Sequence, residues 1–251
     1  MSARRVRPNK GHTRRHRPKA GSPATLGRMA VPTRTEALSL LLSTSPSPRL
    51  LQHMTVVAEV ASFLAYRTTQ AGVAVDRRMV ETAALLHDVD KALPRTHPLR
   101  ELGHGTAGAA WISVAGHPEL ARTLKAHPVM RLDAEDAEAW VTAGPLEERI
   151  VSYADKRATQ RVVSLEQRFD RWRRKHPEYR ARLDRAFEVA RQLEASVCDA
   201  AGVAPGSVER LRWVDEATAR GRASGALPPQ PVADDPAVAG LSNPLDPSAV
   251  A

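Results

Sequence analysis

The chain has 251 residues, enough for one large domain or two small ones. Apolar residues make up 42% of it and aromatic residues only 4%, so we expect a core rich in Ala and Leu, a composition that favours helices over strands. No apolar run reaches the ~20 residues of a membrane-spanning helix, and the basic N-terminus lacks the apolar stretch of a secretory signal. Because Cys198 is the single cysteine, an intramolecular disulfide is excluded, and we expect a reducing, cytoplasmic setting.

The net charge of +9 comes from the N-terminal segment. Residues 1–34 contain ten Lys and Arg and no Asp or Glu, so the remainder carries a formal charge of −1. We predict a basic disordered tail there, able to contact nucleic acid non-specifically. Alternatively, translation begins at Met29 and most of this segment is not made; both interpretations stay open. The Pro- and Ala-rich residues 223–251 are predicted to form a second disordered tail.

The segment between the tails, residues 35–222, has the pattern of a helical domain. No part of it alternates apolar and polar residues over a sustained stretch, so we predict an all-α domain. Ser47 and Pro48 are typical of a helix start, and Gly72 is typical of a helix end. The predicted helices are 35–42, 48–70, 76–86, 106–114, 118–125, a long helical region 145–174, 177–200 and 207–220.

Histidine and aspartate occur on helix faces that should be buried. His53 lies in line with Val57 and Ala61 on the apolar stripe of the helix 48–70. Taken alone, such a histidine more often hydrogen-bonds a carbonyl group than binds a metal. His87 and Asp88 directly follow a run of Ala and Leu, and a carboxylate in that position must be paired, solvated or coordinated because its isolated burial is very costly.

Asp155 repeats this anomaly in the region 145–174, on one face with Val151, Ala158, Val162 and Leu165. A buried ion pair with an arginine is the alternative explanation. Imidazole and carboxylate groups from three separate helices would, however, suit a divalent transition metal, which would also neutralise the buried carboxylates.

Three segments carry a resemblance to a known family: residues 53–58 (HMTVVA), 83–91 (AALLHDVDK) and 150–156 (IVSYADK). Together they resemble the H…HD…D pattern of the HD-domain metal-dependent phosphohydrolases, over roughly residues 48–175. The resemblance implies an HD-domain helical bundle. It also implies that four residues hold a divalent metal: His53, His87, Asp88 and Asp155.

Two further histidines are similar to the extra ligands of the two-metal, HDIG-like branch of this family. They are His104, in the sequence LGHG, and His127, in the sequence LKAHP. We therefore expect two ions bridged by Asp88, although both histidines could instead bind substrate phosphate or water. Many relatives have glycine where this chain has Asp90, which we place outside the ligand set and expect to orient Lys91 or to influence substrate charge.

The function implied by the resemblance is hydrolysis of a phosphoester or phosphoanhydride, with a nucleotide or dinucleotide as the expected substrate. The cofactor would be one or two ions of Mn, Fe, Co, Ni or Zn. Asp88 and Lys91 are the predicted catalytic residues, Asp88 as the bridge that helps to accept the proton of water and Lys91 as a cation near the phosphate. Arg95, Lys156 and Arg157 are weaker candidates.

Two other classes of protein remain as alternatives. One is a regulatory HD module that senses a nucleotide without turnover, against which the intact ligand set argues. The other is an RNA-associated protein that uses the basic N-terminal arm, against which the near-neutral remainder argues. Residues 167–200 contain a second basic stretch, RWRRK at 171–175, which a solvated helix face explains more readily than a nucleic-acid-binding surface does. The oligomeric state is not predicted.

Overall fold

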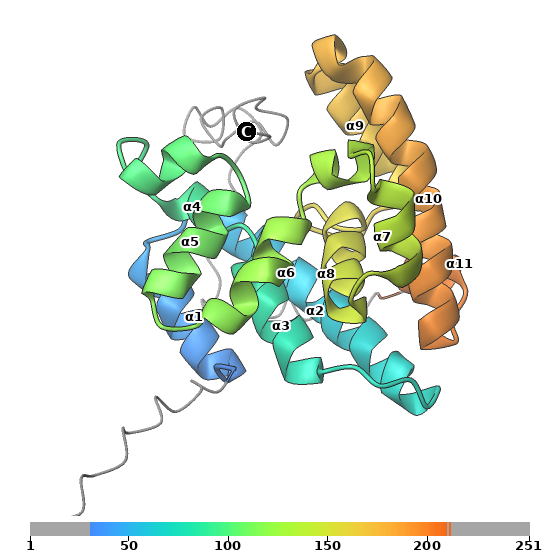
Figure 1. The fold of residues 1–251 in the computed structure, drawn as a ribbon, viewed down its shortest axis with the longest axis horizontal. Helices are drawn as coiled ribbons and strands as arrows, with labels where there is room; N and C mark the ends of the chain where they lie inside the picture. The colour runs from blue at the N-terminus through green and yellow to red at the C-terminus, as the bar shows by residue number, and fades with distance from the viewer. Residues whose placement is uncertain (1–30, 210, 212–251) are drawn as a thin grey trace, which may run out of the picture.

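The computed structural model describes residues 31–209 and 211, and these residues form an all-α bundle (Figure 1). Its α-helices are α1 (Arg34–Ser43), α2 (Pro48–Gln70), α3 (Arg77–Leu86), α4 (Val89–Ala92), α5 (Thr106–Val114), α6 (Ala121–Ala126), α7 (Ala137–Ala143), α8 (Leu146–Lys156), α9 (Leu165–Lys175), α10 (Arg180–Ala201) and α11 (Pro205–Glu209). Short 3-10 helices lie between them: η1 (Pro98–Leu102), η2 (Pro118–Leu120), η3 (Val129–Asp133) and η4 (Pro177–Tyr179). Within the described ranges, extended pairing is limited to one isolated bridge, between Ala158 and Val162.

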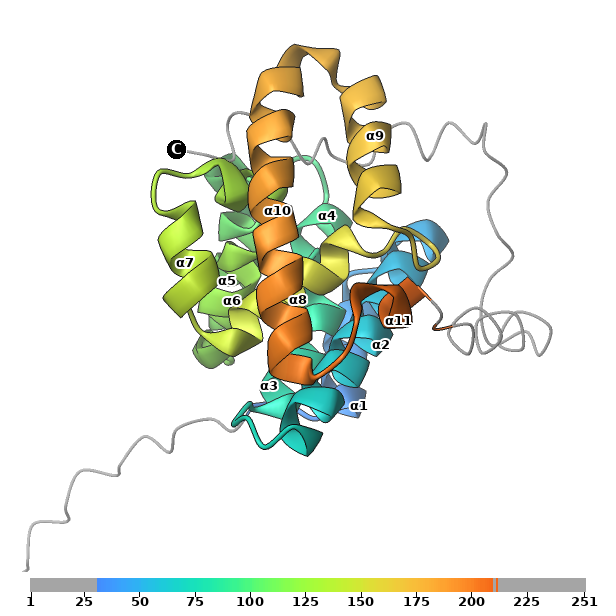
Figure 2. The same cartoon turned by 90° about the vertical axis from the view of Figure 1, so that its right-hand side faces the viewer.

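Helix α2 occupies the middle of the bundle, where it packs against α3, α8 and α10. Its apolar stripe is fully buried, as Val57, Ala61 and Leu64 show. Helices α9 and α10 run side by side as a hairpin along one flank, and α5 packs against α6 on the other (Figures 1 and 2). The central helices α2, α3 and α8 therefore meet in the interior.

Several helices begin where capping residues predict. Ser47 accepts a hydrogen bond from the Leu50 amide at the start of α2, with Pro48 at the first helical position. Asp76 caps α3 in the same way through the Met79 amide. Caps of this kind contribute about 1 kcal/mol each. The predicted helices 35–42, 48–70, 76–86 and 106–114 are confirmed to within one residue at each end.

The long helical region predicted over 145–174 is wrong as a single unit. Helix α8 ends at Lys156, and α9 begins only at Leu165. The Arg157 side chain bonds the Val163 carbonyl group and holds the intervening turn, while Ser164 starts α9 with a capping box to Gln167. The predicted continuous stripe through Asp155 and beyond is therefore broken, although Asp155 itself still faces the interior.

Smaller differences concern the segments between the main helices. The predicted helices 118–125 and 177–200 each begin as a 3-10 turn, η2 and η4, before α6 and α10. Sequence reasoning missed α4, α7, η1 and η3, which are short and lack strong periodicity. The predicted helix 207–220 lies mostly outside the described residues, as do both predicted tails. In the described part of the chain, no helix is both long and apolar enough to cross a membrane.

Candidate metal centre

The His87–Asp88 pair marks the point where α3 stops. Ala83, Ala84 and Leu86 are fully buried, and His87 follows them as the C-cap of the helix. Asp88 has a backbone conformation (φ −103°, ψ 18°) that separates α3 from the four-residue α4, and its side chain makes no capping bond. Its carboxylate is therefore directed into the protein, where only 2% of the residue is exposed.

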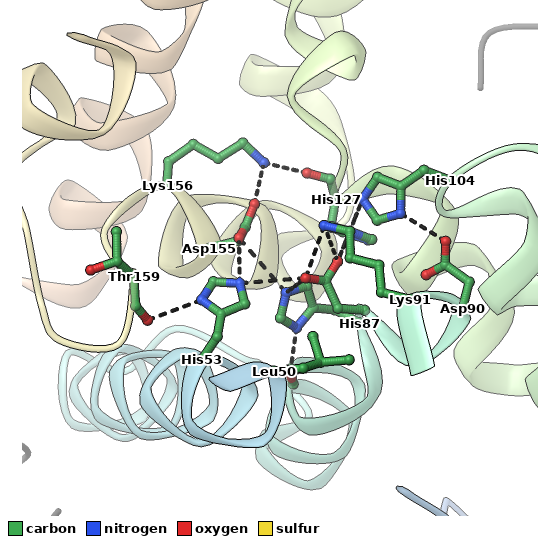
Figure 3. Close-up of polar contacts among 12 residues, drawn as sticks. Leu50, His53, His87, Asp90, Lys91, His104, His127, Asp155, Lys156 and Thr159 are labelled. Carbon is green, nitrogen blue, oxygen red and sulfur yellow. Dashed lines mark hydrogen bonds and ion pairs between the residues drawn. The ribbon is translucent and has the colours of Figure 1, made fainter. Parts of the chain in front are cut away.

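The six residues predicted as metal ligands come together around this carboxylate. Figure 3 labels five of them: His53, His87, His104, His127 and Asp155. All are buried, with exposed fractions of 9% or less. They come from different parts of the bundle: His53 from α2, His87 from the end of α3, Asp88 from the junction of α3 and α4, His104 from the loop before α5, His127 from the end of α6, and Asp155 from α8.

The Asp88 carboxylate divides these residues into two groups. Its Oδ2 atom lies 3.5 Å from His53 Nε2 and 3.4 Å from His87 Nε2. Its Oδ1 atom lies 3.4 Å from His104 Nε2 and 3.3 Å from His127 Nε2. The ligand atoms of each resulting trio lie within 4.8 Å of one another. One carboxylate thus contributes to two adjacent sets of ligand atoms.

Asp155 adds a second carboxylate to the first set. Its Oδ1 atom lies 3.2 Å from His53 Nε2 and 3.7 Å from His87 Nε2. The set that faces Asp88 Oδ2 accordingly offers two imidazoles and two carboxylates, whereas the set that faces Oδ1 offers two imidazoles and one shared carboxylate.

In each of the four histidines of the centre, the ring nitrogen that faces away from Asp88, Nδ1, forms a hydrogen bond with an acceptor. His53 Nδ1 donates to the carbonyl oxygen of Thr159 (3.0 Å), and His87 Nδ1 donates to that of Ala84 (2.7 Å). His127 Nδ1 donates to the carbonyl oxygen of Leu124 (2.5 Å), and His104 Nδ1 donates to the Asp90 carboxylate (2.8 Å). Since a carbonyl oxygen can only accept, the proton of a neutral imidazole is assigned to Nδ1. The four Nε2 lone pairs then point toward the carboxylates.

This arrangement fits a bound cation. The Nε2 atoms of His104 and His127 lie 3.1 Å apart, and with both Nδ1 atoms protonated neither has a proton to donate to the other. Within the described part of the chain, His87 Nε2 is buried without a hydrogen-bond partner, and Asp88 Oδ1 has ion-pair contacts but no hydrogen bond of good geometry. Lone pairs that face one another and face carboxylates repel unless a positive charge lies between them. Buried imidazole and carboxylate donors of this kind suit a divalent transition metal.

Without a bound ion, the buried carboxylates draw positive charge into the centre as a proton on His87. Burial alone would lower the pKa of His87, but the carboxylates of Asp88 and Asp155 outweigh it and raise that pKa to about 9. Burial lowers the pKa of His127 to about 3. Although burial opposes their ionisation, neighbouring cations hold the pKa values of Asp88 and Asp155 well below the usual range. Both carboxylates thus remain charged and attract positive charge into the centre.

A scan against protein-family models identifies the segment that carries this geometry. Residues 50–160 match the HD domain. This segment of the chain is an HD domain. The matched segment runs from the start of α2 to just beyond α8 and contains all six residues of the centre. No match was found among curated proteins or among solved structures.

The HD domain surrounds its two carboxylates with cations. Lys91 Nζ lies 3.0 Å from each Asp88 oxygen and donates a hydrogen bond to Oδ2. Lys156 is fully buried, contacts Asp155 Oδ2 at 3.1 Å and bonds the carbonyl oxygen of His127. Arg168, on α9, approaches Asp155 Oδ1 to 3.4 Å. These contacts fix the carboxylates in position before any ion binds.

Two of these surrounding residues were not predicted in these roles. Asp90 orients His104 rather than Lys91, a contact across fourteen residues that depends on the path of the η1 loop. Arg168 reaches Asp155 only because the chain turns back between α8 and α9, which the predicted single helix did not allow. The weaker candidate Arg157 lies outside the centre, where it pairs with Glu194 in the core.

A glycine allows His104 and His127 to approach each other in the second ligand set, the one formed with Asp88 Oδ1. Gly105 follows His104 and has a φ of +80°, a conformation that favours glycine. A Cβ atom there would lie 2.7 Å from the Cγ atom of Pro128, the residue after His127. The Gly105 backbone thus packs against the Pro128 ring, and this close packing brings His104 and His127 together.

Proposed function

We propose that this HD domain is a metal-dependent phosphohydrolase that cleaves a phosphoester or phosphoanhydride, with a nucleotide or dinucleotide as the expected substrate. The observation that carries the proposal is the Asp88 carboxylate, each oxygen of which faces a different pair of histidines. Members of the HD-domain family are generally metal-dependent hydrolases. A carboxylate shared between two ligand sets is what a site with two adjacent metal ions needs.

The proposed cofactor is a pair of divalent transition-metal ions, drawn from Mn, Fe, Co, Ni and Zn, as in the two-metal, HDIG-like branch. His53, His87 and Asp155 would hold one ion, His104 and His127 would hold the other, and Asp88 would contribute to both. Every ligating imidazole already has its Nδ1 atom fixed, and such outer contacts orient metal ligands and raise their basicity.

The chemistry follows from the groups that surround Asp88. Bound divalent ions would lower the pKa of water and polarise a phosphoryl oxygen. Asp88, whose carboxylate lies between the two ligand sets, would also help to accept a proton from the attacking water. Lys91, whose Nζ atom lies against the same carboxylate, would hold a phosphoryl oxygen and stabilise negative charge that develops on it.

The proposal is tested by a hydrolysis assay on the purified chain, loaded with Mn, Fe or Co and offered a panel of nucleotides. We expect release of phosphate or of a shorter nucleotide by at least one loaded form. Asp88→Asn should abolish this release and sharply reduce the metal content while leaving the helical circular-dichroism signal in place. Asp199→Asn, an exposed carboxylate on α10, is the matched control and should change neither.

A lack of hydrolysis by every loaded form would contradict the proposal. If nucleotides then raised the melting temperature without being consumed, the chain would be the sensing module instead. Full activity in Asp88→Asn would refute the role assigned to this residue.

A further inference from the structure

Cationic side chains from α2 and α9 gather at the edge of the metal centre. We call Arg49, Arg168, Arg171 and Lys175 together the α9 cationic face. Arg168 anchors this group to the centre through its 3.4 Å contact with Asp155 Oδ1. Its guanidinium group also lies over the ring of the buried Trp172, 4.5 Å from the ring centroid, which fixes its direction.

Helix geometry aligns the remaining members with Arg168. Residues 168, 171 and 175 are spaced by three and four positions, so they lie on one face of α9. At 1.5 Å per residue, this row extends about 10 Å from the anchor to Lys175. On α2, Arg49 lies one helical turn before His53, on the same side as that ligand.

The charges of these residues act on one another. Partial burial and repulsion from Arg171 and Arg168 lower the pKa of Arg49. Partial burial and repulsion from Arg171, Arg49 and Lys91 lower the pKa of Lys175. The two helices therefore bring like charges close together beside the centre.

Two other arginines, one on α9 and one on α10, are neutralised by carboxylates. Arg173 on the same helix pairs with Asp170 and Asp184, and Arg182 pairs with Asp133. By contrast, among residues 31–209 and 211, no ion pair to Asp or Glu is found for Arg49, Arg171 or Lys175. Like charges held together without a counter-ion destabilise a fold, and an anionic ligand would relieve the repulsion.

We infer that the α9 cationic face binds the phosphate chain of the substrate, and that this chain has three or more phosphates. This inference rests on the proposed function and names its substrate class, a polyphosphate ester rather than a monophosphate. A row of about 10 Å exceeds what one phosphate group can span, so the phosphate at the metal centre would be followed by others along α9. Arg171 and Lys175 are then specificity-determining residues.

Binding of tripolyphosphate and of orthophosphate to the full chain, measured by calorimetry, tests this inference without requiring turnover. We expect Arg171→Glu and Lys175→Glu each to weaken tripolyphosphate binding about tenfold, because each replaces an attraction by a repulsion, and to change orthophosphate binding much less. Both side chains are exposed, so the variants should fold. Arg191→Glu makes the same charge change at an exposed position of α10 and should leave both affinities unchanged.

Each outcome bears on one claim. Unchanged tripolyphosphate affinity in both variants would overturn the inference even if nucleotides are hydrolysed. If the two variants lost binding to a single-stranded oligonucleotide but kept wild-type affinity for tripolyphosphate, the inference would also be overturned, and the face would be assigned to nucleic acid. If tripolyphosphate binds through the face but no nucleotide is cleaved, the inference stands and the proposed hydrolysis fails.

Discussion

At the scale of single residues, the metal centre is organised by what lies behind its histidines. Three Nδ1 atoms donate to backbone carbonyl oxygens, which are fixed by the helices that contain them or by the turn after α8. His104 differs, because its Nδ1 donates to a side chain, the Asp90 carboxylate, at 2.8 Å. The orientation of His104 can therefore be changed by a single substitution.

Asp90→Asn should weaken one ligand set and spare the other. The amide keeps the shape of the acceptor but removes the charge that assists His104, and loss of such an outer contact typically costs about 10–100-fold in metal affinity. We expect this loss, measured by metal titration, for one ion of two, with the other ion bound as in the wild type. Glu101→Gln, which removes an exposed carboxylate from η1, is the control. Equal weakening of both ions would argue against two separate ligand sets.

The sequence allowed these six residues to be proposed because burial of polar groups carries a large cost. His53 on an apolar stripe and Asp88 after a run of buried residues each need a polar partner in the interior. The family resemblance implies that this partner is the same for both, a divalent metal ion. The structure brings all six together, while their role as ligands stays a prediction. The role of Asp90 could not be predicted in the same way, because no local pattern places it against His104.

At the scale of helices and turns, the start of α5 determines whether the second ligand set can form. Gly105 combines a φ of +80° with close packing against Pro128. Gly72 has nearly the same backbone angle, +81°, but a methyl group added there would have no neighbouring atom within 4 Å. An alanine at position 72 would thus introduce backbone strain alone, whereas an alanine at position 105 would introduce both the strain and a steric clash.

Gly105→Ala should therefore damage the centre, whereas Gly72→Ala should damage only stability. Both substitutions cost about 1–2 kcal/mol for the left-handed backbone. At position 105 the new methyl group must also displace Pro128, which moves His104 away from His127. We expect denaturant titration to show destabilisation in both variants and metal titration to show a weakened ion only in Gly105→Ala. Wild-type metal binding by Gly105→Ala would show that this packing does not position the ligands.

The ends of the helices show where sequence reasoning worked and where it failed. Ser47, Pro48 and Asp76 marked the starts of α2 and α3 because their side chains or rings serve the first turn directly. The break between α8 and α9 had a comparable signal in Ser164 and Gln167, a capping box, which the apolar spacing across 151–165 obscured. That break is also what allows Arg168 to return to Asp155.

At the scale of the whole molecule, charge is distributed unevenly. The residues beyond the basic segment 1–34 carry a formal charge of −1, yet the bundle places a buried pair of carboxylates next to the α9 cationic face, which Arg168 links to Asp155. The predicted all-α class is confirmed, and the helical order brings α2, α3 and α8 together at the carboxylates. Such an arrangement suits metal ions inside and a phosphate chain outside.

The number of metal ions per chain tests the central claim most directly. The full chain would be loaded with Mn, freed of excess metal and measured by elemental analysis. The account predicts two ions per chain, and it predicts that Asp88→Asn loses both because the carboxylate contributes to both ligand sets. A chain that binds no ion would contradict the metal centre, and a single ion that survives in Asp88→Asn would contradict the shared role of Asp88.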